Sequence, residues 1–446
     1  MNLAQFDRQV IGEVWAENAV EKAMQYLCDQ CNGRFACSAD ERRAGDFMLE
    51  QMRLFGLKNV HAEPFEMLGW VRGTAALSVA FEGMVKDLDA WEMACSPTGS
   101  AEGELLDIGD GTKESIEARS AEIAGKVILT NTQGPHRSIK YALCQKAGAV
   151  GLVIYNGAQG SMKPAGSVSL GDMPLHMPAV GVSYETGTYL LRQLALGKVL
   201  TMKVSTTSTN AKMEARDIIG EIPGTDPDAG WIIVGGHYDG HDIAQGAHDN
   251  ASGTVLALEC ARVLAPLAGQ LKTGLRFILF SGEELGLYGS FSYADKHPEE
   301  MDKIRAVFNA DIVGMAAPLV LMTQEAPEFA EYLKSLPMEN LGFVVNDKTY
   351  IPHSDHFPFA MKGLSTLMAV TSRPAIPSAW GHTTADTLDK VQYNELKQAC
   401  VTAARILLRM ALDGTDLPKV RKSAEAVMED IRNHGYEETL KLQGIL

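Results

Sequence analysis

One histidine and four carboxylates lie between residues 231 and 311, and each can bind a metal ion or transfer a proton. They are His237, Asp249, Glu283, Glu284 and Asp311. Several carboxylates in one partly buried crevice repel one another and raise one another's pKa unless a cation holds them ionised. Oxygen ligands alone suit magnesium or calcium, whereas imidazole together with carboxylate suits zinc or a neighbouring transition metal. The residue types therefore predict a metal site.

Three apolar segments indicate the strands that position these residues. They are WIIVGGHYDG (231–240), LRFILFSGEELG (275–286) and IRAVFNADIVG (304–314), and each carries one or two of the five side chains past its apolar part. Short apolar runs that alternate with helical patterns are typical of a parallel sheet covered on both faces. Such a sheet binds ligands beyond the carboxyl ends of its strands. We therefore expect an α/β fold with a doubly wound, mostly parallel sheet, in which the five side chains converge.

Five segments together resemble the family of co-catalytic zinc exopeptidases, which includes bacterial leucyl aminopeptidases and glutamate carboxypeptidases. The segments occur in the family's order and cover most of residues 212–415. In sequence order they are His237-Tyr238-Asp239, GAHDNASG (246–253), SGEELGLYGS (281–290), NADIVG (309–314) and GHTTADTLDKV (381–391).

The resemblance implies two zinc ions and a ligand set for each. Asp249 would bridge the two ions. His237 and Asp311 would complete the ligands of one ion. Glu284 and His382 would complete those of the other.

The resemblance also implies which residues act on protons. Glu283 would be the general base, because zinc lowers the pKa of a bound water to near 7 and a carboxylate can then take its proton. Asp239, two residues after His237, would accept the second imidazole proton and fix the tautomer. A simpler reading of Asp239 is a turn residue in the sequence DGHD.

Other polar residues nearby receive no firm role. His241 and His248 lie between His237 and Asp249, but the ligand set is complete without them, so we do not expect them to bind metal. The segment IPHSDHFPF (351–359) resembles a loop of the same family. Its Ser354, Asp355 and His356 either line the substrate cleft or only shape the loop.

Changes of pattern along the chain predict four parts. Residues 1–98 form the amino-terminal part of the catalytic domain, and residues 209–415 form the di-zinc peptidase catalytic domain itself. Residues 99–208 resemble the protease-associated domain, a small α+β insertion found in such peptidases. Residues 416–446 form a charged helical tail.

Composition restricts the partners and the compartment. The chain has 446 residues and a net charge of −16, which argues against nucleic acid and anionic membrane surfaces as partners. No apolar run approaches the length of a membrane span, and the amino terminus does not read as a signal peptide. Seven scattered cysteines indicate reduced thiols, so we expect a cytoplasmic protein. The sequence predicts no oligomeric state.

The function that these observations favour is a zinc-dependent aminopeptidase that acts on peptides. The matched segments resemble the aminopeptidases at least as well as the carboxypeptidases, and no obvious basic cluster awaits a substrate carboxylate. Carboxypeptidase or dipeptidase activity of the glutamate carboxypeptidase type remains an alternative. A non-hydrolytic binding protein on the same fold is another, although all five ligands and Glu283 are present. The insertion argues against a third, a glutaminyl cyclase.

Overall fold

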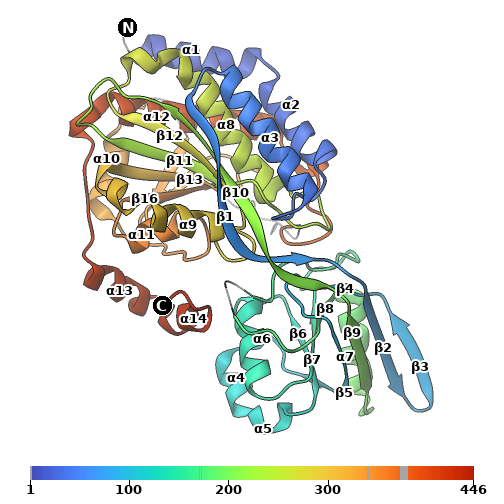
Figure 1. The fold of residues 1–446 in the computed structure, drawn as a ribbon. Helices are drawn as coiled ribbons and strands as arrows, with labels where there is room; N and C mark the ends of the chain where they lie inside the picture. The colour runs from blue at the N-terminus through green and yellow to red at the C-terminus, as the bar shows by residue number, and fades with distance from the viewer. Residues whose placement is uncertain (1–2, 170, 172, 339–341, 372–379) are drawn as a thin grey trace.

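The computed structural model describes residues 3–169, 171, 173–338, 342–371 and 380–446. Within these residues the strands form two eight-stranded sheets. Figure 1 shows one sheet in the upper part of the molecule, surrounded by helices, and the other in the lower part. The chain passes from the first sheet to the second and back again.

The first sheet is mixed, with strand order β1-β10-β12-β11-β13-β16-β14-β15. Its four central strands run parallel, whereas β1, β10 and β14 pair with their neighbours towards the centre in the antiparallel direction. The strands are β1 (Lys58–Val71), β10 (Thr209–Ile222), β12 (Gly274–Phe280), β11 (Trp231–His237), β13 (Ile304–Ala310), β16 (Thr366–Thr371), β14 (Leu319–Met322) and β15 (Phe343–Asn346). The parallel centre confirms the predicted α/β class.

Alternating side chains of the central strands bury both faces of this sheet. In β11, Ile232 and Val234 pack into one core, while Ile233 between them packs into the other. This two-sided burial explains the continuous apolar runs of the sequence. The larger core is covered by α1 (Leu3–Ala16), α2 (Ala19–Gln25), α3 (Ala39–Leu54), α8 (Gly253–Leu264), α10 (Pro327–Ser335) and α12 (Tyr393–Asp413). The smaller is covered by α9 (Tyr288–Lys296) and α11 (Phe357–Met361).

Among the described residues, one helical segment is long and apolar enough to pass a test for a membrane span by length and composition. It is Ala247–Gln270, which contains α8. Most of its apolar window, 78%, is buried inside the protein, where α8 packs against the central strands. The core helix of a globular domain passes the same test.

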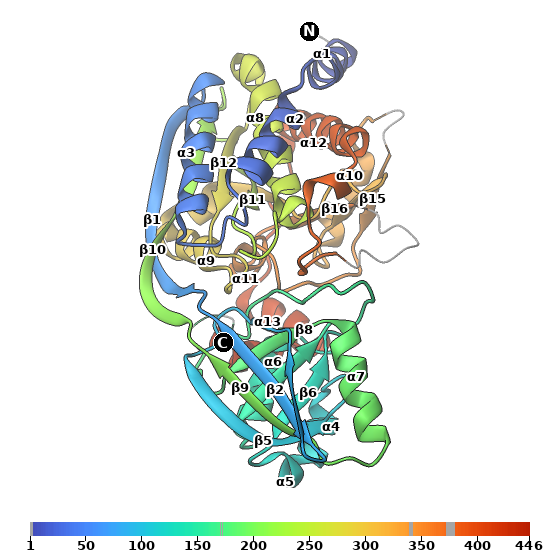
Figure 2. The ribbon, with the colours of Figure 1, turned by 90° about the vertical axis from the view of Figure 1, so that its right-hand side faces the viewer.

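The second sheet has the order β3-β2-β9-β5-β6-β7-β8-β4. It consists of β2 (Ala75–Phe81), β3 (Met84–Leu88), β4 (Trp91–Glu92), β5 (Gly99–Asp107), β6 (Val127–Asn131), β7 (Gly151–Tyr155), β8 (Ala179–Val182) and β9 (Thr201–Thr206). Four helices accompany it: α4 (Lys113–Ala118), α5 (Ser120–Ile123), α6 (Arg137–Lys146) and α7 (Tyr184–Ala195). Figure 2 shows α6 and α7 on opposite faces of this sheet. We call residues 75–206 the insert domain.

The second sheet begins at residue 75, earlier than residue 99, where the sequence analysis placed the start of the insertion. Residues 58–95 read as a succession of strands without a compositional break. The sequence pattern therefore does not reveal that the chain changes sheets after Val71. Part of residues 1–98 consequently belongs to each sheet.

Strands β1 and β10 form the connection between the two sheets. They are paired antiparallel from Lys58 opposite Glu221 to Val71 opposite Thr209. Figures 1 and 2 show this two-stranded ribbon running down one side of the first sheet and on towards the second. The chain therefore enters and leaves the second sheet through two neighbouring, paired strands.

The tail segment (residues 416–446) leaves the end of α12 and contains α13 (Ala424–Asn433) and α14 (Glu437–Leu442). Figure 1 places both helices below the first sheet, with α14 next to the insert domain. Ile431 and Leu440 are fully buried against Leu287, Tyr350 and Phe357 of the catalytic domain. The tail is thus packed onto the body of the protein.

Candidate active site

The predicted site residues gather at the carboxyl ends of the central strands. His237 is the last residue of β11, and Asp311 directly follows β13. Glu283 and Glu284 lie three and four positions after β12 ends at Phe280. Because these strands are parallel, their ends meet at one edge of the sheet and bring the side chains together.

Asp249 lies between two histidines. Its Oδ1 is 3.3 Å from Nε2 of His237, and its Oδ2 is 2.9 Å from Nε2 of His382. The carboxylate is 7% exposed, and it comes from the segment that precedes α8. The two oxygens therefore face two different positions, as a carboxylate that bridges two cations requires.

The first group of ligand atoms surrounds His237. Nε2 of His237 is 3.6 Å from Oδ1 of Asp311 and 4.0 Å from Oε2 of Glu283. The ligand atoms of these three residues all lie within 4.8 Å of one another, close enough to surround a single ion.

The second group surrounds Glu284. Its Oε2 is 3.4 Å from Nε2 of His382 and 2.9 Å from Nε2 of His241. His241 was not expected to be a ligand, yet the structure brings its imidazole into this group. His248 faces elsewhere, because its Nδ1 lies 3.8 Å from Asp386.

Burial and charge in the cluster favour a bound cation. Burial raises the pKa of Glu283 well above its usual value, and the neighbouring carboxylates of Glu284 and Asp311 raise it further against the opposing effect of His237. Glu284 Oε1 and Asp311 Oδ1 are buried without a hydrogen-bond partner among the described residues. A cation compensates both the repulsion and the unpaired oxygens. The mixture of imidazole and carboxylate fits zinc.

Asp239 contacts the backbone or side chain of three other residues of the site. It is completely buried, and its Oδ1 lies 3.5 Å from Nδ1 of His237. Its two oxygens also accept hydrogen bonds from the backbone N–H groups of Glu283 (3.2 Å) and Glu284 (3.3 Å). The backbone carbonyl of Asp239 lies nearer to Nδ1 of His237, at 3.2 Å, so Asp239 contacts the histidine through both its backbone and its side chain. Its side chain also orients the loop that carries both glutamates.

Asp386 is a site residue to which sequence reasoning gave no role. Its carboxylate accepts hydrogen bonds from the backbone N–H groups of His248 (2.9 Å) and Asp249 (3.1 Å). Burial raises the pKa of Asp386 to about 6. Asp386 lies in the segment GHTTADTLDKV, four positions after His382. This position is the only feature of the sequence that could have identified Asp386 as a site residue.

Ser354 holds the carboxylate of Asp311. Its hydroxyl donates to Oδ2 of Asp311 at 2.6 Å and accepts from the side-chain amide of Asn309 at 2.7 Å. This leaves Oδ1 of Asp311 directed at His237. The loop 351–359 therefore supports a candidate ligand, a role that differs from both readings left open from the sequence.

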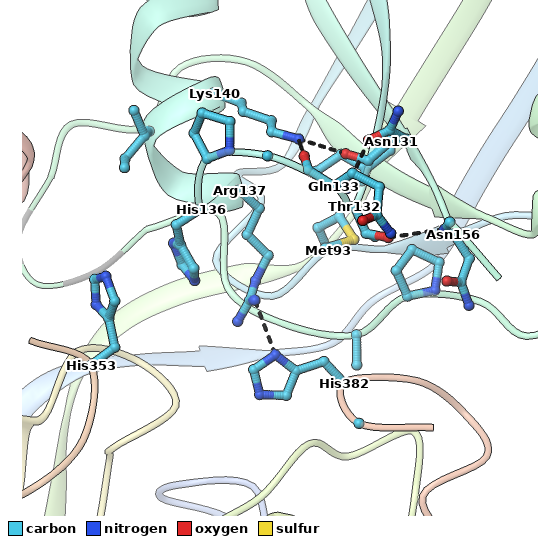
Figure 3. A pocket seen from close by; sticks show the side chains of 18 of the residues that line it. Met93, Asn131, Thr132, Gln133, His136, Arg137, Lys140, Asn156, His353 and His382 are labelled. Atoms are coloured by element: carbon cyan, nitrogen blue, oxygen red, sulfur yellow. Dashed lines mark hydrogen bonds between the residues drawn. The ribbon is translucent and has the colours of Figure 1, made fainter. Parts of the chain in front are cut away.

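The insert domain reaches the site through Arg137, the first residue of α6. Its Nη1 lies 3.1 Å from Nδ1 of His382, as Figure 3 shows. The backbone of the insert domain also holds the loop of His382. Ala165 N donates to the carbonyl of His382 (2.7 Å), and Thr384 N donates to the carbonyl of Lys163 (3.2 Å).

Two cavities meet at these residues. A pocket of about 190 Å³, which we call the metal pocket, is lined by Asp249, Glu283, Glu284, Asp311 and His382, among others. A cavity of about 940 Å³ lies between the two domains (Figure 3). Both are lined by His136, Arg137, His353 and His382, so the two cavities lie next to each other.

A parallel sheet centre whose strand ends hold a buried imidazole and carboxylate cluster, next to a cavity of ligand size, defines a metal-dependent hydrolase. The sequence profile of peptidase family M28 matches residues 217–407, and that of the PA domain matches residues 93–190. The chain belongs to peptidase family M28 and carries an inserted PA domain.

Individual relatives agree with this assignment. Aminopeptidase YwaD of Bacillus subtilis is 28% identical over 91% of this chain and 88% of its own length. Carboxypeptidase Q of Mus musculus is 24% identical over 66% of this chain and 65% of its own length. The solved structure of an aminopeptidase from Aneurinibacillus sp. strain AM-1 is 26% identical, with a TM-score of 0.68 over 90% of this chain and 95% of that one.

Proposed function

We propose that this peptidase is a zinc aminopeptidase, which releases the amino-terminal residue of peptides. The observation that carries the proposal is the position of Asp249, whose two oxygens face His237 and His382, with Glu283 beside them. Two relatives, YwaD and the Aneurinibacillus enzyme, are aminopeptidases, and this supports the proposal.

The proposal includes two zinc ions. His237 and Asp311 would hold one, Glu284 and His382 would hold the other, and Asp249 would bridge them. When bound, zinc lowers the pKa of water and polarises the scissile carbonyl. The distances within the two ligand groups support this division.

Glu283 would move the proton. Its carboxylate lies at the edge of the first group, 4.0 Å from His237, and takes a proton from the attacking water. The same carboxyl group then gives the proton to the departing amine. Asp239 keeps Glu283 in place through the backbone N–H of that residue. Asp239 is therefore a positioning residue in this scheme.

The carboxylates of the site favour a substrate with a free ammonium group. Asp249, Glu283, Glu284 and Asp311 together place negative charge where the amino terminus would lie.

One observation favours a second candidate function, carboxypeptidase activity. Arg137 supplies the basic group at the site that sequence reasoning did not find, and Carboxypeptidase Q is among the relatives.

The decisive experiment compares Leu-Gly-Gly with its amino-acetylated form, using the zinc-loaded protein and product analysis. We expect leucine to be released from the free peptide and the rate on the acetylated peptide to fall about 100-fold or more, because acetylation removes the charge that the site attracts. Release of the carboxy-terminal glycine from both peptides at equal rates would establish the carboxypeptidase instead.

A further inference from the structure

The tail segment contributes a wall to the metal pocket. Ile445 lines that pocket together with Asp249, Glu283 and His382, although it lies more than 60 positions after His382 in the sequence. Ile445 is partly buried, and its backbone N–H donates to the carbonyl of Leu440 in α14 at 2.9 Å. The helix therefore fixes where Ile445 lies.

The tail is fastened to both domains. Leu440 is fully buried in the catalytic domain, as described above, while Leu442 packs against a core cluster to which both domains contribute. Gln443 is 2% exposed, and its side-chain amide lies 3.5 Å from Oγ of Ser138 in α6. Lys113 of the insert domain forms an ion pair with Glu438. These contacts hold the end of the tail against the pocket.

Part of the lining of the metal pocket is apolar. The apolar residues in it include Leu287, Ile312, Pro352, Met368 and Ile445. The guanidinium of Arg137 lies on the pocket wall as well, and it disfavours a cationic side chain of the substrate. An apolar wall beside the metal ligands suits an apolar side chain on the residue being released.

The size of the pocket suits one amino-acid residue. Its volume of about 190 Å³ corresponds to about six water molecules at roughly 30 Å³ each. The larger cavity, also lined by Tyr436 and Thr439 of the tail, has room for the rest of a peptide. The tail thus lines both the metal pocket and the neighbouring larger cavity.

We propose that the tail segment is part of the substrate site, and that Ile445 limits the size of the amino-terminal side chain, selecting peptides that begin with a compact apolar residue. This inference rests on the proposed aminopeptidase function. It assigns to the tail a role in specificity, and to Ile445 a contact with the substrate itself.

The test measures kcat/KM for the aminoacyl 4-nitroanilides of alanine, leucine and phenylalanine, with wild type, Ile445→Ala and Ile445→Trp. We expect Ile445→Trp to lower the leucine-to-alanine ratio about tenfold or more, because a filled pocket excludes the larger side chain. Ile445→Ala should raise the phenylalanine-to-leucine ratio about several-fold, because a smaller side chain at this position leaves room for the larger substrate. The matched control is Leu446→Ala, whose side chain does not line the pocket. Its ratios should equal those of wild type.

Ratios within twofold of wild type in both Ile445 variants would overturn the inference. Calorimetric binding of free leucine and alanine to the zinc-loaded proteins gives a second measurement that does not need turnover. If wild type hydrolyses no aminoacyl nitroanilide, the proposed function fails. The binding ratio then decides the role of Ile445 alone: an unchanged preference for leucine in Ile445→Trp refutes it, and a lost preference supports it.

Discussion

Arg137 of the insert domain lies 3.1 Å from Nδ1 of His382, although the two residues are 245 positions apart in the sequence. A guanidinium can only donate hydrogen bonds, so this contact requires an unprotonated Nδ1. A histidine that binds zinc through Nε2 usually carries a proton on its other nitrogen and donates it. The positive charge of Arg137 also opposes a cation nearby. We therefore expect Arg137 to weaken metal binding at His382, a proposed ligand.

The change Arg137→Ala should tighten zinc binding about tenfold, on the order of 1–2 kcal/mol for the loss of one nearby charge. Arg137→Lys keeps the charge and should change the affinity less. Competition with a chromogenic chelator measures the dissociation constant. Arg192→Ala, an exposed arginine of the same domain, is the control. Weaker zinc binding in Arg137→Ala would contradict the argument.

Glu283 and Glu284 are adjacent but should respond differently to substitution. Glu283→Gln removes the proton acceptor and should lower kcat about 100-fold or more while zinc content is kept. Glu284→Ala removes a proposed ligand and should lose zinc. Elemental analysis and kcat on the same preparations distinguish the two. Equal loss of zinc in both variants would show that Glu283 is a ligand and not the base.

Asp386 should influence metal binding without touching the metal. Its carboxylate holds the backbone N–H groups of His248 and Asp249, so Asp386→Ala frees the segment that carries the proposed bridging ligand. We expect a loss of zinc affinity of about 10-fold to 100-fold, as for other groups that orient ligands. Asp389→Ala is the matched control, because that side chain is 70% exposed. Equal affinities of the two variants would count against this role.

A pH dependence of stability is expected from Asp7 in α1, far from the site. Burial tends to raise the pKa of Asp7, but hydrogen bonds and charges from Arg409 and Arg405 in α12 lower it from 3.8 to about 2. A carboxylate with a lowered pKa stabilises the fold fully above about pH 4, and this contribution is lost as the pH falls towards 2. The pairs lie partly at the surface, so we expect about 1 kcal/mol.

The corresponding variant is Asp7→Asn, measured by urea unfolding at pH 7 and pH 2. It should be less stable than wild type by about 1 kcal/mol at pH 7, and the difference should become much smaller at pH 2, because the pKa of about 2 leaves only about half of the wild-type carboxylate ionised there. Asp295→Asn, in which the side chain is 64% exposed, is the control. A difference that is the same at both pH values would rule out the charge as its cause.

The local pattern of the sequence was sufficient for the centre of the site. His237 and Asp311 could be placed at strand ends because the strands before them are buried on both faces and therefore continuously apolar. Asp249 and His382 required the resemblance to a family, since neither follows an apolar run directly. The mixed directions at the edges of the sheet leave no trace in such a pattern.

Residues that approach the site from other parts of the chain could not be predicted. Arg137 begins a helix of the insert domain, and Ile445 follows a helix of the tail, so neither is near the ligands in sequence. Their positions depend on how the domains and the tail pack together. The periodicity of apolar residues indicates which face of a helix or strand is buried, but it does not indicate which distant element covers that face.

The pairing of Val71 with Thr209 has a consequence for how the molecule can be divided. The residues that lead into and out of the insert domain are neighbours across two paired strands, so the whole of residues 72–208 occupies the place of a hairpin loop. A two-residue Asn-Gly turn joins such strands without changing their register. The first sheet can therefore be closed as a continuous hairpin in a shortened chain. That chain would keep every proposed zinc ligand and Glu283, and it would lack Arg137 and the part of the larger cavity's wall that the insert domain supplies.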